Sequence, residues 1–147
     1  MPQVSENPRY ILENAVTIAV LGAHDDPARA SHYVPAYLHR MGYRIIPVNP
    51  MRAGEVWWGE VVRADLSECP GKIDLIDVFR RADLLQAHLA EILAMRPLPT
   101  WVWLQLGIRH DAFAASLRAH GIGVVQDRCT LADHQHFGLP SRSARGT

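Results

Sequence analysis

Short apolar segments alternate with amphipathic ones along this chain, and the alternation constrains the fold more than any other feature. Segment 15–22, AVTIAVLG, is apolar, rich in β-branched residues and stopped by Gly22. That pattern is typical of a strand buried on both faces of a parallel sheet. Later segments of the same character cover 44–48, 73–79, 101–106 and 123–127. Apolar residues at helical spacing lie between them, over 29–41, 82–95 and 110–120.

Strands that alternate with helices form parallel sheets through right-handed crossovers. We therefore predict an α/β fold: a Rossmann-like doubly wound parallel sheet of about five strands with helices on both faces. A closed eightfold barrel would need about 250 residues, and this chain has 147. Segment 56–62 is predicted as a short strand or a turn, and 65–69 as one helical turn.

The chain reads as one domain with two short flanking segments. We expect residues 1–14 to form an N-terminal segment with a short helix over 8–13. Residues 15–139 are predicted to form the Rossmann-like domain, and 140–147 to be a disordered tail, since the sequence after 128 turns polar.

Charge and cysteine content exclude several classes of protein. Lys+Arg and Asp+Glu are both 15, so the net charge is zero. A general nucleic-acid or membrane-surface binder would need a basic surplus. The sequence contains no run of about eighteen apolar residues, so no membrane span is predicted. No secretory signal is visible at the start. The cysteines, Cys69 and Cys129, form neither a disulfide framework nor a CxxC pair. We expect a cytoplasmic protein with free thiols.

Positive charge follows the ends of the predicted strands, where ligands bind in open parallel sheets. The arginines at this edge are Arg29, Arg52, Arg80, Arg81, Arg109 and Arg128. Together with helix N-termini, such residues suit a phosphate ligand. The alternative is that they pair with the aspartates of the same edge, which are Asp25, Asp26, Asp83, Asp111 and Asp127.

The loop after the first strand narrows the choice of ligand. A dinucleotide fingerprint needs G-x-G-x-x-G there and an acidic residue after the second strand. This chain has only Gly22 in the loop, and its second strand ends in Asn49-Pro50. NAD is therefore disfavoured. A Walker A loop is also absent from the sequence, which disfavours a P-loop NTPase.

Four segments carry a family resemblance, in this order: VLGAHDDPARASHYVPAYLHRMGYRIIPVNP, DLIDVFRR, VWLQLGI and VVQDRC. They resemble the small stand-alone bacterial CoA-binding proteins. Those proteins are similar to the N-terminal CoA-binding domain of the succinyl-CoA synthetase alpha subunit. The resemblance covers about residues 10–139 and implies a Rossmann-like domain that binds coenzyme A.

The resemblance also implies which residues hold the ligand. By analogy, the pyrophosphate loop would be lined by Gly22, Ala23, His24 and the segment from Arg29 to Ser31. The nucleotide would be bordered by Val48, Asn49 and Pro50. The adenine and ribose phosphate would be flanked by Phe79, Arg80 and Arg81, and the other side closed by Gln105, Leu106 and Gly107.

Some residues depart from the family pattern or have a simpler interpretation. His24 stands where the family usually has Ser, and it could bind a phosphate or cap its own loop. His32-Tyr33 replaces a common Tyr-Arg pair, and Leu131-Ala132 stands where the family has a basic residue. Ser31 is equally compatible with a helix cap and a ligand contact.

Cys129 follows the last strand, so we expect it near the ligand, where a mixed disulfide with the CoA thiol is chemically open. The alternative is a small packed residue, which is also the expectation for Cys69. A metal site at Cys129, His134 and His136 is disfavoured, because no second ligand pair supports it.

Other chemistry-bearing residues have structural interpretations. Asp74 and Asp77 are three apart on a strand and face opposite sides, so no catalytic pair is predicted. Trp101 and Trp103 share one side and are expected in the core. The segment around Trp57-Trp58 is a possible partner surface.

We therefore expect a protein that binds CoA or an acyl-CoA and lacks a complete catalytic apparatus. An NAD-binding sensor and a small CoA-dependent acyl-transfer enzyme are the alternatives. The expected partner is a small molecule rather than a nucleic acid or a membrane, and a protein partner or a homo-oligomer stays possible.

Overall fold

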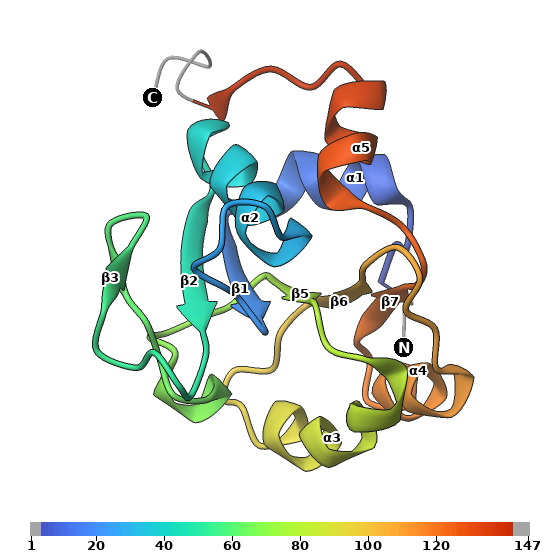
Figure 1. Ribbon diagram of the computed structural model, residues 1–147. Helices are drawn as coiled ribbons and strands as arrows, with labels where there is room; N and C mark the ends of the chain where they lie inside the picture. Colours follow the sequence, from blue (N-terminus) through green and yellow to red (C-terminus); the bar gives the residue numbers. More distant parts are fainter. Residues whose placement is uncertain (1–3, 143–147) are drawn as a thin grey trace.

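The structure is a computed structural model, and it describes residues 4–142 (Figure 1). A parallel sheet of five strands has the order β2-β1-β5-β6-β7. Its strands are β1 (Thr17–Leu21), β2 (Arg44–Val48), β5 (Leu75–Val78), β6 (Trp101–Leu104) and β7 (Gly123–Val125). Each coincides with a predicted strand, which confirms the predicted sheet. Residues 1–3 and most of the predicted tail, 143–147, lie outside the described residues.

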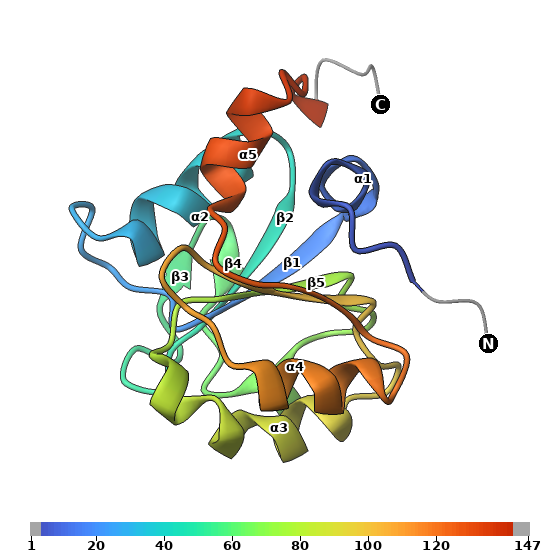
Figure 2. The same cartoon turned by 90° about the vertical axis from the view of Figure 1, so that its right-hand side faces the viewer.

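Helices cover both faces of the sheet, as predicted (Figure 2). One face carries α1 (Pro8–Asn14), α2 (Ala30–Arg40) and α5 (Thr130–His136), and the other carries α3 (Gln86–Leu93) and α4 (Asp111–Arg118). Two 3-10 turns, η1 (Leu66–Glu68) and η2 (Ala82–Leu84), precede α3. None of the helices in the described part of the chain has the length and apolar character needed to cross a membrane.

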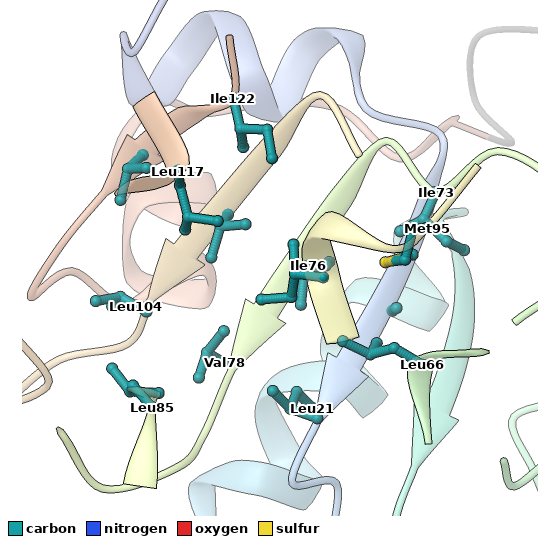
Figure 3. Packing of buried hydrophobic residues seen from close by; sticks show 14 of the residues in the cluster. Leu21, Leu66, Ile73, Ile76, Val78, Leu85, Met95, Leu104, Leu117 and Ile122 are labelled. Atoms are coloured by element: carbon teal, nitrogen blue, oxygen red, sulfur yellow. The ribbon is translucent and has the colours of Figure 1, made fainter. Parts of the chain in front are cut away.

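Two apolar layers hold the helices on the sheet. The layer under α3 and α4 includes Leu21, Ile76, Val78 and Leu104, all buried (Figure 3). The opposite layer includes Trp101 and Trp103, as predicted for the core. The Trp103 indole N–H donates to the carbonyl of Arg128 at 2.7 Å, which ties the end of the sheet to the chain that enters α5.

Helix α5 was not expected, because its buried positions are polar: Thr130, Asp133 and His134. Each has a polar partner. Asp133 accepts two hydrogen bonds from Arg128, at 2.7 and 2.9 Å. His134 Nδ1 lies 2.7 Å from the Tyr37 hydroxyl. A helix held in this way leaves no apolar stripe in the sequence.

Segment 56–62 forms a two-stranded antiparallel hairpin, β3 (Val56–Trp57) and β4 (Glu60–Val61), outside the main sheet. Arg44 of β2 forms an ion pair with Glu60 at 2.9 Å. Beyond the hairpin, Arg63 bridges to Val48. Its amide donates to the Pro47 carbonyl, and its carbonyl accepts the Asn49 amide, both at 2.9 Å. The hairpin region is therefore fastened along the outer edge of β2.

Residues 140–142 begin the segment predicted as a tail, and Arg142 is held in place. Its guanidinium donates to the carbonyls of Leu12 and Glu13, each at 3.2 Å. It also lies 4.4 Å from the centre of the Tyr43 ring. The end of the described chain therefore closes over α1.

The strand order places a switch point between β1 and β5. After β1 the chain moves outward to β2, and it then returns to the other side of β1 through β5. In doubly wound sheets the crevice beyond the carboxyl ends of such strands is the usual place for a ligand.

Candidate functional site at the carboxyl edge

Gly22 closes β1 at the switch point and has a φ of +88°. A Cβ added here would lie 2.9 Å from the Phe79 carbonyl oxygen and 3.2 Å from the Arg80 Cδ. Both the left-handed backbone and the crowding require glycine. The carboxyl ends of β1 and β5 therefore meet closely, and the Arg80 side chain crosses the turn.

Two adjoining cavities open at this edge. The first, called the β1–β2 cavity, has a volume of about 890 Å³. From the predicted site it contains Gly22, Ala23, His24, Arg29, Ser31, Val48, Asn49, Pro50, Phe79 and Arg80. The second, called the β5–β6 cavity, has a volume of about 530 Å³. From the predicted site it contains Ser31, Phe79, Arg80, Arg81, Gln105, Leu106, Gly107 and Cys129.

The structure thus brings every residue of the predicted site to one cavity or the other, and both cavities share Ser31, Phe79 and Arg80. These residues come from loops that are far apart in the sequence. Their gathering follows from parallel strands that all end at one edge. Their role in holding a ligand stays a prediction.

Asn49 fastens the loops that wall the β1–β2 cavity. Its side-chain amide donates to the Ala23 carbonyl at 2.8 Å, and its Oδ1 accepts the Met51 amide at 2.8 Å. His24 Nδ1 accepts the Asp26 amide at 3.0 Å, so this nitrogen caps its own loop, one of the two roles considered for His24. A neutral ring that accepts at Nδ1 carries its proton on Nε2.

The arginines of this edge fall into two groups. Five of the six form ion pairs: Arg29 with Asp26, Arg52 with Asp25, Arg81 with Asp83, Arg109 with Asp111 and Arg128 with Asp133. Pairing with aspartate, considered as the alternative to phosphate binding, therefore accounts for most of the local charge. Asp127 instead accepts the Gly107 amide at 2.6 Å.

Arg80 is the exception. Within residues 4–142, its guanidinium forms no ion pair, and its Nε is buried without a hydrogen-bond partner. The side chain lies in the wall that both cavities share. A buried donor without a partner costs free energy, so this atom indicates where an acceptor is missing.

Behind the β5–β6 cavity lies a buried carboxyl. Asp77, on β5, has no exposed surface, and it accepts hydrogen bonds from the Gln105 amide and, at 3.0 Å, from the Thr130 hydroxyl. Burial raises the pKa of Asp77 to about 7, although both hydrogen bonds act to lower it. Asp74 is not part of this hydrogen-bonded group. Its Oδ2 instead accepts hydrogen bonds from the backbone amides of Val16 and Thr17, both at 2.9 Å.

His88 and Glu91 were not among the predicted site residues, and they lie in the wall of the β1–β2 cavity. His88 Nδ1 lies 2.8 Å from Glu91 Oε1, and Glu91 Oε2 accepts the Leu66 amide at 2.9 Å. Their i,i+3 spacing was visible in the sequence. The direction in which α3 presents them was not, because it depends on how η1 packs beside that helix.

The cysteines differ in position. Cys129 is half-buried in the wall of the β5–β6 cavity and also packs against the apolar layer that contains Trp103, so its position fits both of the roles predicted for it. Cys69 packs partly against the layer under α3, and burial raises the pKa of its thiol to about 11. Among residues 4–142, no three His, Cys, Asp or Glu side chains gather in an arrangement suited to a metal ion.

A family model described as CoA binding domain matches residues 16–135. The chain belongs to the CoA-binding domain family. Its match spans all strands of the sheet and both cavities of the carboxyl edge. The family resemblance predicted from the four sequence segments is therefore confirmed.

The chain is also similar to individual proteins and solved structures. The Bacillus subtilis protein YneT is 35% identical over 126 residues, which cover 86% of this chain and 90% of YneT. A solved Thermus thermophilus structure, cell-free ID.343, is 49% identical with a TM-score of 0.84, and the match covers 88% of this chain and 98% of that one. An acetyl-coenzyme A synthetase from Ca. Korarchaeum cryptofilum is 16% identical with a TM-score of 0.65. The match covers 82% of this chain and 27% of the synthetase chain, and it shows a shared fold.

Proposed function

We propose that this protein binds CoA or an acyl-CoA across the two cavities and acts as a binding protein rather than as a complete enzyme. Membership of the CoA-binding domain family supports the ligand class. The adjoining cavities at the sheet edge support the location, because CoA is a long molecule with a charged nucleotide at one end and a mostly apolar arm at the other.

The unpaired Arg80 guanidinium is the observation that carries the proposal. Its neighbours on this edge already have carboxylate partners, whereas Arg80 has none within the described chain and buries its Nε. A phosphate in the cavity would pair with this guanidinium through charge-assisted hydrogen bonds from its terminal nitrogens, since Nε itself is sealed from solvent. The ribose phosphate of CoA, expected from the family resemblance beside Phe79 and Arg80, is such a group.

The cavity walls suggest how the ligand lies. We place the adenosine and its phosphates in the β1–β2 cavity, beside Gly22, Asn49 and Arg80. The arm would then cross the shared wall into the β5–β6 cavity and end near Cys129. Leu106 and Ile108 give that cavity an apolar lining, which suits a chain of methylene and amide groups.

Titration calorimetry with CoA, dephospho-CoA and NAD tests the proposal, with a thermal unfolding series in parallel. CoA should bind most tightly, and a concentration of about 100 times Kd should stabilise the fold by roughly 2.7 kcal/mol. Equal or tighter binding of NAD would favour a nucleotide sensor instead. Release of free CoA from a bound acetyl-CoA would favour the acyl-transfer alternative.

A further inference from the structure

A closed ring of hydrogen bonds lies behind the β5–β6 cavity. The Thr130 hydroxyl donates to Asp77 Oδ2 at 3.0 Å. The Gln105 side-chain amide donates to Asp77 Oδ1, and also to the Thr130 hydroxyl oxygen at 2.8 Å. Asp77 and Thr130 have no exposed surface, and Gln105 retains 4%. The ring joins β5, the end of β6 and the start of α5.

The ring fixes which way the Gln105 amide faces. A glutamine amide has two N–H donors on Nε2 and one carbonyl acceptor, and a threonine hydroxyl has a single proton. Thr130 gives that proton to Asp77, so its oxygen needs a donor from Gln105. Asp77 Oδ1 is also an acceptor. While Asp77 is ionised, both needs are met only when Nε2 points inward, which turns Oε1 outward.

Gln105 Oε1 therefore faces the cavity as an immobile acceptor. It has no hydrogen-bond partner among residues 4–142, yet it is not sealed from solvent. The unpartnered side-chain atoms that are sealed in the described chain are the Nε atoms of Arg80 and Arg142. Gln105 lines the β5–β6 cavity, so its remaining surface opens there.

The rest of this wall makes the acceptor selective. The lining of this cavity also includes the apolar side chains of Phe79, Leu106 and Ile108. A ligand that displaces water here without offering a donor leaves Oε1 unpaired, which weakens its binding. A ligand with an N–H at this depth satisfies it. The discrimination comes from a polar atom whose orientation is set before binding.

We propose that Gln105 Oε1 accepts an amide N–H of the pantetheine arm, and that this contact selects ligands carrying an amide there. Asp77 and Thr130 act through Gln105 as positioning residues. The inference rests on the proposed function, since it needs CoA in these cavities. The recognising atom is Gln105 Oε1, and the recognised group is an amide N–H of the pantetheine arm.

Ligand analogues test the contact in the unaltered protein. In two CoA analogues, one or the other amide N–H of the arm is replaced by an ester oxygen. One analogue should bind about tenfold more weakly than CoA, which corresponds to about 1.4 kcal/mol. The Gln105→Met variant should bind CoA and that analogue with equal affinity. If the wild-type protein binds both analogues as tightly as CoA, the contact does not exist.

Protein variants separate the contact from a general structural effect. Gln105→Met should bind CoA about tenfold more weakly and leave the affinity for adenosine 3′,5′-bisphosphate, which lacks the arm, unchanged. Gln126→Met is the matched control. Gln126 follows β7, bonds to His110 and Asp111, and lies outside both cavities. It should alter neither affinity.

The outcomes also separate this inference from the proposed function. If wild-type protein binds no CoA, both fall. If CoA binds and Gln105→Met weakens CoA and the bisphosphate equally, or weakens neither, the proposed function stands and the role of Gln105 is overturned.

Discussion

The two cavities of the carboxyl edge share a wall and differ in how their polar groups are satisfied. Around the β1–β2 cavity, charged side chains pair across loops near the surface, as Arg52 does with Asp25 at 2.9 Å. Behind the β5–β6 cavity, the polar groups are neutral or titratable, almost completely buried and bonded in a ring. Surface pairs can exchange partners at little cost, whereas a buried ring cannot.

This difference indicates a division of labour. The first cavity can adapt its charges to a phosphate, because its ion pairs are partly exposed to solvent. The second has few polar atoms in fixed orientations, which suits recognition of a less polar arm. Arg80 lies between them and belongs to neither pattern.

Asp77→Asn should change how stability depends on pH. The pKa of Asp77 is raised from 3.8 to about 7 in the fold, so the folded state holds its proton more tightly than the unfolded state. Ionisation therefore destabilises the fold as the pH rises from about 4 to 7, by at most about 4 kcal/mol. The variant lacks this loss, so its free energy of unfolding relative to wild type should rise over that window.

Chemical denaturation of both proteins at several pH values measures the difference. A difference that stays constant from pH 4 to 8 would show that the Asp77 carboxyl is not protonated more readily in the fold. The buried ring would then not differ in kind from the surface pairs of the other cavity.

Arg80→Ala should weaken CoA binding by about 1.5–3 kcal/mol, which is the contribution of a hydrogen bond to a charged group. That corresponds to a loss between about tenfold and just over a hundredfold. The loss for dephospho-CoA should be smaller if Arg80 meets the ribose phosphate. Calorimetry with both ligands decides, and equal losses would place the guanidinium against the pyrophosphate instead.

Gly22→Ala and Gly107→Ala compare one turn from each cavity. Both glycines have positive φ values, +88° and +86°, so alanine is strained at either position. Only at Gly22 would the new Cβ also meet a backbone oxygen, that of Phe79, at 2.9 Å, whereas Gly107 has open space around it. Gly22→Ala should therefore cost about 1–3 kcal/mol of unfolding free energy, and more than Gly107→Ala. Equal losses would mean that the crowding at the switch point relaxes freely.

Arg81→Ala should have the smallest effect. Its side chain is 77% exposed and pairs with Asp83, itself exposed, and such pairs contribute about 0–1 kcal/mol. CoA affinity should fall by less than about fivefold. A loss as large as that of Arg80→Ala would show that Arg81 leaves Asp83 for the ligand, and the distinction between the two neighbours would disappear.

The sequence was sufficient for the sheet and for the edge where the site lies. Buried parallel strands such as Thr17–Leu21 are apolar throughout, and the residues after them are then brought to one edge by topology alone. Helix α5 escaped detection because Thr130, Asp133 and His134 are buried through polar partners elsewhere in the chain. Hydrophobic periodicity detects the burial of apolar side chains, but it does not detect polar side chains that are buried through hydrogen bonds or ion pairs.

The arginines show the same limit of sequence-based prediction within the site. Their presence at strand ends was visible, whereas their pairing depends on loop geometry that brings Arg52 to Asp25. Arg80 and Arg81 are adjacent in the sequence, and only Arg81 has a carboxylate two residues away, but the sequence alone does not show that this carboxylate forms the ion pair. His88 was missed for a similar reason, since its approach to the cavity depends on packing between α3 and η1.

The contacts between the hairpin region and β2 also limit the pairing of this sheet edge with strands of other molecules. An edge strand with free amides and carbonyls is a template for a strand from another molecule. Here Pro47 has no amide to offer on that side, its carbonyl is taken by Arg63, and the Asn49 amide is taken as well. The carboxyl half of β2 is thereby withdrawn from intermolecular pairing, and the protein should resist edge-to-edge aggregation there even when concentrated.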